Sequence, residues 1–356
     1  MANMYEKAPT LFEHFAPMYL YVTFTMLLLA TMTWVYMNVP TESQLSLTAW
    51  PKLPWIYIQI MFSALIKGKE LGTVKKQKAD EQEIIEVRVL MPKAFDLKTL
   101  SKFKLITGNS SPLTSEVPLL YPIVESFRLC MQVMALPRFP LNVLGSVLAR
   151  NRAEFFQPIH PTDRLVYSCR MDSVLRTTAK GDTEVDLIST ALNAEGELVW
   201  KNTLTVIVLG KNRFKAGSKA AGSKVENGHI ASSTEAECAW LNIGTIELNE
   251  GSGRQYGFLN GDVNPIHMHS FLSRLFGYKR PIAHALYLVA RAESAIMAKG
   301  VKLQYPCALA TDFKRPTLLP AKLQVEMAQK AQILHFRLLT SESLTKVVLT
   351  GNIMRT

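Results

Sequence analysis

The stretch from Asn260 to Leu288 reads NGDVNPIHMHSFLSRLFGYKRPIAHALYL and is the part of the chain richest in chemical groups. Gly261 can adopt backbone angles that other residues avoid, and Pro265 suits the first turn of a helix. We therefore expect a turn here, between a strand and a helix. Asp262 and His267 are then held five residues apart on that turn.

An acid and an imidazole on one turn can act on the same water molecule. His267 can take a proton from that water, while Asp262 orients it or returns a proton to a substrate. Asn264 can hold a neighbouring group, and the backbone N–H of Ala285, at a break in the helical stretch, can polarise a carbonyl. Asp and Asn before a helix are also ordinary N-caps, so a structural role of Asp262 and Asn264 stays open.

The composition indicates a large globular protein. The chain has 356 residues, of which 48% are hydrophobic and 19% charged, which suggests two domains and excludes a disordered protein. Four scattered cysteines form no CxxC pair and no histidines have convincing ligand spacing, so no metal site is expected. The net charge of +11 suits nucleic acid, an anionic membrane or a phosphate-bearing ligand. Because the basic residues are not interleaved with aromatic ones, nucleic acid is disfavoured.

A long uncharged segment near the start predicts a membrane anchor within residues 1–50. Residues 15–39 contain no charged side chain, and as a helix they would reach about 37 Å, enough to cross a bilayer. A cleaved signal peptide fits poorly, because the segment lacks a basic beginning and a small-residue cleavage site. Lysines are concentrated after the segment, which predicts a single-pass membrane protein with its later domains on the cytoplasmic side.

A second apolar segment, Leu53–Ile66, is too short to span a membrane. It is either a core helix or an interfacial helix. The lysines that follow it either meet anionic lipid or form a solvated surface.

Periodicity divides the rest of the chain into two similar halves. Each half has one helical pattern, at about 118–136 and 269–297, accompanied by candidate strands. The strands are expected at 84–90, 165–171, 184–193, 198–209, 307–313, 323–329, 332–339 and 346–353. This order predicts an α+β protein in which an antiparallel sheet wraps around a long helix in each of two domains, 51–210 and 238–356. A flexible basic linker is expected at 211–237.

The 260–288 segment resembles the signature of the MaoC-like (R)-specific enoyl-CoA hydratases, which are acyl dehydratases with a hot-dog fold. The shared pattern is a Gly-Asp-x-Asn-Pro-hydrophobic-His core, a small residue at Ser273, then Gly277 and an Ile-x-His-Gly segment. The resemblance extends through ATDFKRPTLLPAKLQVEM at 310–327 and into the first half, so it covers about residues 51–356.

This resemblance implies a tandem (double) hot-dog fold whose first half lacks the catalytic motif. The implied reaction is hydration of trans-2-enoyl-CoA to (3R)-hydroxyacyl-CoA, or the reverse dehydration, by a hydro-lyase of fatty-acyl metabolism that needs no cofactor. The positions that match the family's site are Asp262 and His267 for catalysis, Asn264 beside them, and Gly261, His284 and Ala285 for positioning the substrate and its oxyanion. The acyl group would be carried by CoA or by an acyl carrier protein, and a homodimer stays open.

Four basic residues are candidates for contacts with CoA phosphates, with a solvated surface role as the alternative: Lys279, Arg280, Lys314 and Arg315. Two positions depart from the family's pattern. Asn260 stands where a small residue is common and could crowd the pocket or donate a hydrogen bond. Ala285 stands where the family has Gly, and it is strained if the position needs a positive φ. These departures keep open a non-catalytic acyl-thioester-binding protein, whereas a hot-dog thioesterase is disfavoured by the motif itself.

Overall fold

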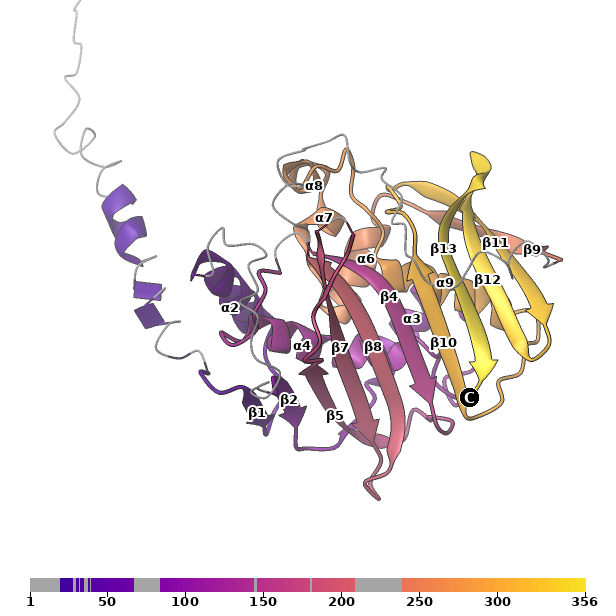
Figure 1. Cartoon of the computed structure of the whole chain (residues 1–356), viewed down its shortest axis with the longest axis horizontal. Helices are drawn as coiled ribbons and strands as arrows, with labels where there is room; N and C mark the ends of the chain where they lie inside the picture. Colours follow the sequence, from indigo (N-terminus) through magenta and orange to yellow (C-terminus); the bar gives the residue numbers. More distant parts are fainter. Residues whose placement is uncertain are drawn as a thin grey trace, which may run out of the picture.

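The computed structural model describes residues 20–27, 30, 31, 33, 34, 38, 40–66, 84–143, 146–179, 181–208 and 239–356. In this part of the chain a long, mostly antiparallel sheet forms one layer, and α3, α4 and α9 lie behind its strands in Figure 1. The order along the sheet is β1-β2-β5-β7-β8-β4-β10-β13-β12-β11-β9.

The sheet consists of two halves that repeat one topology. The elements of the first half are β1 (Gln44–Leu47), α2 (Leu53–Ile66), β2 (Glu86–Val89), β3 (Lys93–Ala94), α3 (Leu97–Thr107), α4 (Tyr121–Ala135), β4 (Val147–Phe155), β5 (Arg164–Met171), β6 (Arg176–Thr177), β7 (Thr183–Leu192) and β8 (Leu198–Val208). Those of the second half are β9 (Leu241–Leu248), α6 (Ser252–Asn260), α7 (Pro265–Met268), α8 (Ser270–Leu275), α9 (Ala285–Met297), β10 (Cys307–Phe313), β11 (Ala321–Lys330), β12 (Ile333–Thr340) and β13 (Ser343–Arg355). The order β2-β5-β7-β8-β4 in one half matches β9-β11-β12-β13-β10 in the other, with α4 and α9 in equivalent places.

The halves are joined by the antiparallel pairing of β4 with β10. Their register runs from Cys307 opposite Phe155 to Asp312 opposite Arg150. Main-chain hydrogen bonds therefore continue across this junction, as they do within one sheet. We call the β4–β10 pairing the seam between the two halves. The α+β, double hot-dog architecture that the sequence predicts is confirmed.

Several local predictions are corrected. The residues before Gly261 form the helix α6 and not a strand. The positions that this helix buries recur at helical spacing, but only Tyr256 among them is a large apolar residue, so the sequence carried no clear apolar pattern. The helical stretch expected at 269–297 is two helices, α8 and α9, separated by a loop that contains Pro281. The first helix ends before Gly277, whose φ of +84° is the left-handed angle that terminates helices, and Pro281 cannot donate the hydrogen bond that would resume it.

The prediction of a membrane-spanning anchor, and of a single-pass location with the domains on the cytoplasmic side, is wrong. Among the residues that the structure describes, none belongs to a helix that is both long and apolar enough to cross a membrane. The longest described run in the expected span is residues 20–27, about 12 Å of helix. Of the rest of that span, only residues 30, 31, 33, 34 and 38 are described, and the others, like the linker expected at 211–237, lie outside the described residues.

The apolar segment Leu53–Ile66 is the helix α2, and it packs on α4. Ile56 and Ile60 are buried against Met131 and Ala135. The core-helix interpretation of this segment is therefore the one that the packing supports.

A buried carboxylate connects the two central helices. Glu293 of α9 accepts hydrogen bonds from the N–H groups of Leu119 and Leu120, directly before α4 begins. Those N–H groups lie at a helix N-terminus that has no side-chain cap of its own. Burial raises the pKa of Glu293 to about 7, although both hydrogen bonds oppose the rise.

We expect Glu293 to make stability fall as the pH rises from about 4.5 to about 7. The folded protein holds this proton more tightly than the unfolded chain, so deprotonation favours unfolding across that interval. Between pH 5 and pH 8 the wild-type protein should lose roughly 2–3 kcal/mol of unfolding free energy relative to Glu293→Gln, measured by urea denaturation. Parallel pH profiles for the two proteins would contradict this assignment.

Candidate active site

A pocket of about 520 Å³ lies between the two halves. The first half supplies most of its apolar wall from α2, α4, β4, β7 and β8. Residues that form this wall include Ile60, Met61, Met131, Met134, Leu204 and Val206. The second half supplies the polar end, from the loop after α6, the start of α9 and residues 313–317. An apolar pocket with a few convergent polar groups is the usual form of a small-molecule site.

The loop after α6 is folded by its own side chains. Helix α6 ends at Gly261, which has φ +84°. The Asp262 N–H donates to Asn260 Oδ1 at 2.9 Å, and the Asn264 N–H donates to Asp262 Oδ1 at 3.2 Å. Asn260 is buried, and its side-chain oxygen accepts a hydrogen bond that fixes the loop. From the sequence alone, we expected this side chain to crowd the pocket or to donate a hydrogen bond.

Asn264 begins the short helix α7, with Pro265 in its first turn. Its Oδ1 accepts the Ile266 N–H at 3.3 Å, so it is an N-cap, and it also lines the pocket. The capping role that the sequence left open for Asn264 is therefore present at the edge of the pocket.

Two histidines stack beside the loop. The rings of His267 and His284 lie 3.7 Å apart between centroids, and both side chains are buried. His267 Nδ1 is 2.7 Å from the carbonyl oxygen of Ile282, and His284 Nε2 is 3.0 Å from that of Asp262. Because a carbonyl only accepts, each of these nitrogens carries a proton in the neutral ring. The free lone pair is then on Nε2 of His267 and on Nδ1 of His284.

Burial moves the acid and the bases in opposite directions. It raises the pKa of Asp262, against a smaller lowering by His267 and by the Asn264 N–H. It lowers the pKa of His267, against a smaller opposing effect of Asp262. Burial and then the neighbouring His267 hold the pKa of His284 well below its usual value. Both imidazoles are therefore neutral at neutral pH, as a general base must be.

The N-terminus of α9 faces this group. His284 is the N-cap and its side chain makes no capping hydrogen bond, while Ala285 and Leu286 line the pocket. The first N–H groups of a helix have no intrahelical acceptor and carry partial positive charge. In the described part of the chain, the only non-glycine residue with positive φ is Ala331, so the strain considered for Ala285 is absent.

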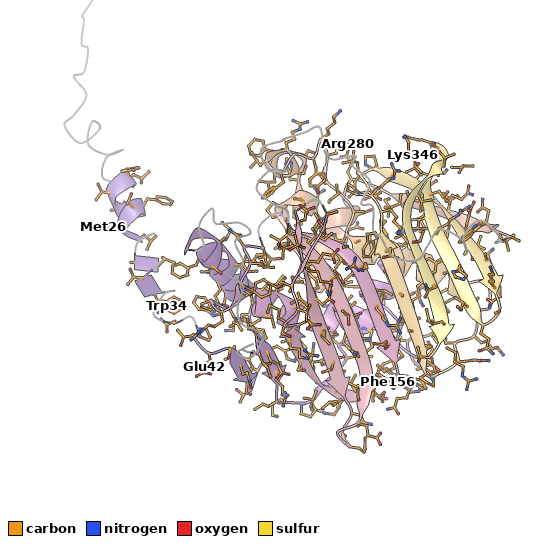
Figure 2. All side chains as sticks on the ribbon, in the orientation of Figure 1. Met26, Trp34, Glu42, Phe156, Arg280 and Lys346 are labelled. Carbon is orange, nitrogen blue, oxygen red and sulfur yellow. The ribbon has the colours of Figure 1, made fainter. Side chains whose placement is uncertain are left out.

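Only some of the other predicted site residues line the pocket. Lys314 and Arg315 line the pocket, whereas Lys279 and Arg280 are exposed and do not. Figure 2 shows Arg280 at the surface near α8. Gly261 does not line the pocket either. Its positive φ ends α6 and sets the direction of the loop.

Asp262, His267 and His284 are also the described residues that could hold a metal ion, with one ligand atom of each within 4.8 Å of the others. Their orientation does not fit this use. The rings stack at an interplanar angle of 25°, so their in-plane lone pairs run side by side and do not converge on one ion. In addition, Nε2 of His284 is occupied by the Asp262 carbonyl.

The first half contains the remnant of a second such loop, which sequence analysis missed. Residues 108–112 (GNSSP) follow α3 as residues 261–265 (GDVNP) follow α6. Asn109 Oδ1 accepts the Ser111 N–H at 3.1 Å, as Asp262 does with Asn264. An amide thus replaces the acid, and Thr114 stands at the position of His267.

Buried Lys104 fills this remnant. Its ammonium donates to the Pro112 carbonyl at 2.6 Å and to Ser111 Oγ at 2.9 Å. The equivalent position in α6 is Gly257, where an added Cβ would lie 2.6 Å from the Asp262 carbonyl oxygen. Glycine therefore allows the loop to lie close to the helix in the second half, whereas in the first half the lysine side chain extends to the loop and hydrogen-bonds to it.

We expect Gly261→Ala to destabilise the protein more than Gly277→Ala. Both glycines have φ +84°, but an added Cβ meets Leu53 at 2.8 Å in the first case and has open space in the second. Gly277→Ala should cost about 1 kcal/mol for its backbone angle alone, and Gly261→Ala about 1–2 kcal/mol, because the end of the Leu53 side chain must also move aside. Equal costs in chemical denaturation would show that α2 does not press on the loop.

Comparison with known proteins agrees with this architecture. Residues 239–351 match the family described as MaoC like domain. The chain is 26% identical over 217 residues to 3-hydroxyacyl-thioester dehydratase X of Mycobacterium tuberculosis, which is 60% of this chain and 71% of the relative.

Solved structures share the fold. A crystal structure of HtdX of Mycobacterium tuberculosis has a TM-score of 0.61 at 20% identity and covers 76% of this chain and 99% of its own. A MaoC-like dehydratase from Phytophthora capsici has a TM-score of 0.56 at 16% identity, with 75% and 96% covered. Residues 239–351 are therefore similar to a MaoC like domain, and the two halves together share the fold of these solved structures.

Proposed function

We propose that the protein is a hydro-lyase that interconverts trans-2-enoyl and (3R)-3-hydroxyacyl thioesters. The observation that carries this proposal is the placement of a neutral, buried His267 beside Asp262 at the polar end of an apolar pocket. The similarity to a relative named as a 3-hydroxyacyl-thioester dehydratase supports the same reaction class.

In the hydration direction, the proposed step adds one water across the C2–C3 double bond. His267 Nε2 removes a proton as the water oxygen bonds to C3, and a proton is delivered to C2, for which the carboxyl of Asp262 is the donor or the relay. The raised pKa of Asp262 helps it to hold that proton. Dehydration is the same sequence in reverse.

The thioester oxygen gains negative charge during this step. The N–H of Ala285, at the uncapped start of α9, is the proposed donor to that oxygen. An ordinary backbone angle at Ala285 means that the donor does not require glycine there. Lys314 and Arg315 at the pocket are the proposed partners of a phosphate on the thioester carrier. The proposed mechanism uses no metal or other cofactor.

Loss of the acid or the base should abolish most of the activity. We expect Asp262→Asn and His267→Ala each to lower the hydration rate of crotonyl-CoA at least about 100-fold while ligand affinity is retained. The measurement is the fall of enoyl-thioester absorbance, with and without a chelator, alongside calorimetric binding. Unchanged rates in both variants would contradict the assignment, and binding without turnover in the wild-type protein would indicate a binding protein.

The apolar wall should set the acyl chain length. Met134 is half-buried on α4 and lines the pocket. We expect Met134→Trp to raise the KM for a C12 enoyl-CoA about 10-fold or more and to leave crotonyl-CoA unaffected, because the added ring fills space that only a long chain needs. Met134→Leu, of similar volume, is the control. Equal effects on both substrates would place the chain elsewhere.

A further inference from the structure

The helix α2 reaches across the seam to the loop that holds Asp262. The hydroxyl of Tyr57 donates to the Gly261 carbonyl at 2.8 Å and accepts the Val263 N–H at 2.7 Å. These two groups flank Asp262 on either side, and they lie more than 200 residues away in the sequence. One side chain thus holds the backbone on both sides of the acid.

The contact closes a compact turn. The Val263 N–H is also 3.1 Å from the Gly261 carbonyl oxygen, which is a hydrogen bond between residues two apart in the sequence. Tyr57 Oη bonds to both of these backbone groups and so strengthens the turn. Leu53, one helical turn before Tyr57, lies where a Cβ on Gly261 would be. The loop is therefore hydrogen-bonded by Tyr57, which itself lines the pocket, and is contacted by Leu53 at Gly261, which does not.

The helix α2 is itself fixed to the first half. Its buried Gln59 accepts a hydrogen bond from Gln132 of α4 at 2.8 Å, and Ile56 and Ile60 pack on the same helix. Because α2 is fixed in this way, the hydrogen bonds of Tyr57 fix the position of the loop relative to the first half. Burial and the charge of Asp262 both raise the pKa of Tyr57, so the phenol keeps its proton and can donate at neutral pH.

We propose that Tyr57 is a positioning residue, which aims Asp262 at the reacting water by fixing the Gly261–Val263 backbone. The same helix contributes Ile60 and Met61 to the pocket wall, so the first half shapes both the space for the acyl chain and the direction of the acid. The kinetic side of this inference rests on the proposed hydro-lyase function, whereas its structural side does not.

The test compares Tyr57→Phe with Tyr305→Phe. The control also loses one phenolic hydrogen bond between the halves, to Glu116, but it is not at the pocket. In hydrogen–deuterium exchange, we expect peptides that cover residues 258–266 to exchange about 10-fold faster in Tyr57→Phe and to be unchanged in Tyr305→Phe. Unchanged exchange in both variants would overturn the inference, whether or not the protein turns over enoyl thioesters.

Kinetics separate a positioning role from general destabilisation. We expect Tyr57→Phe to lower kcat about 10-fold with little change in KM, and to have no further effect in an Asp262→Asn background, because its influence passes through that carboxyl. An equal loss in both backgrounds would overturn the role through Asp262. If the loop exchanges faster in Tyr57→Phe but the wild-type protein does not turn over enoyl thioesters, the loop contact is confirmed and the proposed function is contradicted.

Discussion

The pairing of β4 with β10 is the contact on which the rest of the molecule depends. It makes two hot-dog halves into one sheet, with the register fixed from Cys307 opposite Phe155 to Asp312 opposite Arg150. Because α4 and α9 lie on the same face of that sheet, a carboxylate of one can cap the other, as Glu293 does. The pocket lies along this seam and could not form from either half alone.

The seam also explains how the proposed roles in chemistry and in binding are divided between the halves. The second half carries the acid, the imidazole and the open helix N-terminus, and the first half carries most of the apolar wall. Burial brings the proton affinities of a carboxyl and an imidazole closer together, which favours proton transfer near neutral pH. The remnant loop in the first half keeps the backbone turn, but Lys104 and Asn109 leave it without an acid or a base.

Much of the fold was predictable because most strands alternate apolar and polar residues. β4 was not predicted, since its inward positions are Ala149, Asn151, Ala153 and Phe155, and only the last is large and apolar. The membrane anchor was predicted from the length and the lack of charge of one segment, and no helix of the described residues is long and apolar enough to cross a membrane.

The candidate site was also predictable only in part. The spacing of Asp262 and His267 predicted that they meet, because both lie on one short turn. The stacking of His267 on His284, the role of Asn260 and the contact from Tyr57 depend on tertiary packing. Tyr57 is more than 200 residues from the loop that it holds, so no local pattern could connect them.

We propose that this pocket performs stereospecific hydration, and the configuration of the product is the decisive measurement. The measurement is chiral analysis of the 3-hydroxyacyl thioester formed when the wild-type protein is incubated with crotonyl-CoA. We expect the (3R) product, formed as the enoyl absorbance falls. A (3S) product, or an enoyl band that persists while the substrate is bound, would contradict it.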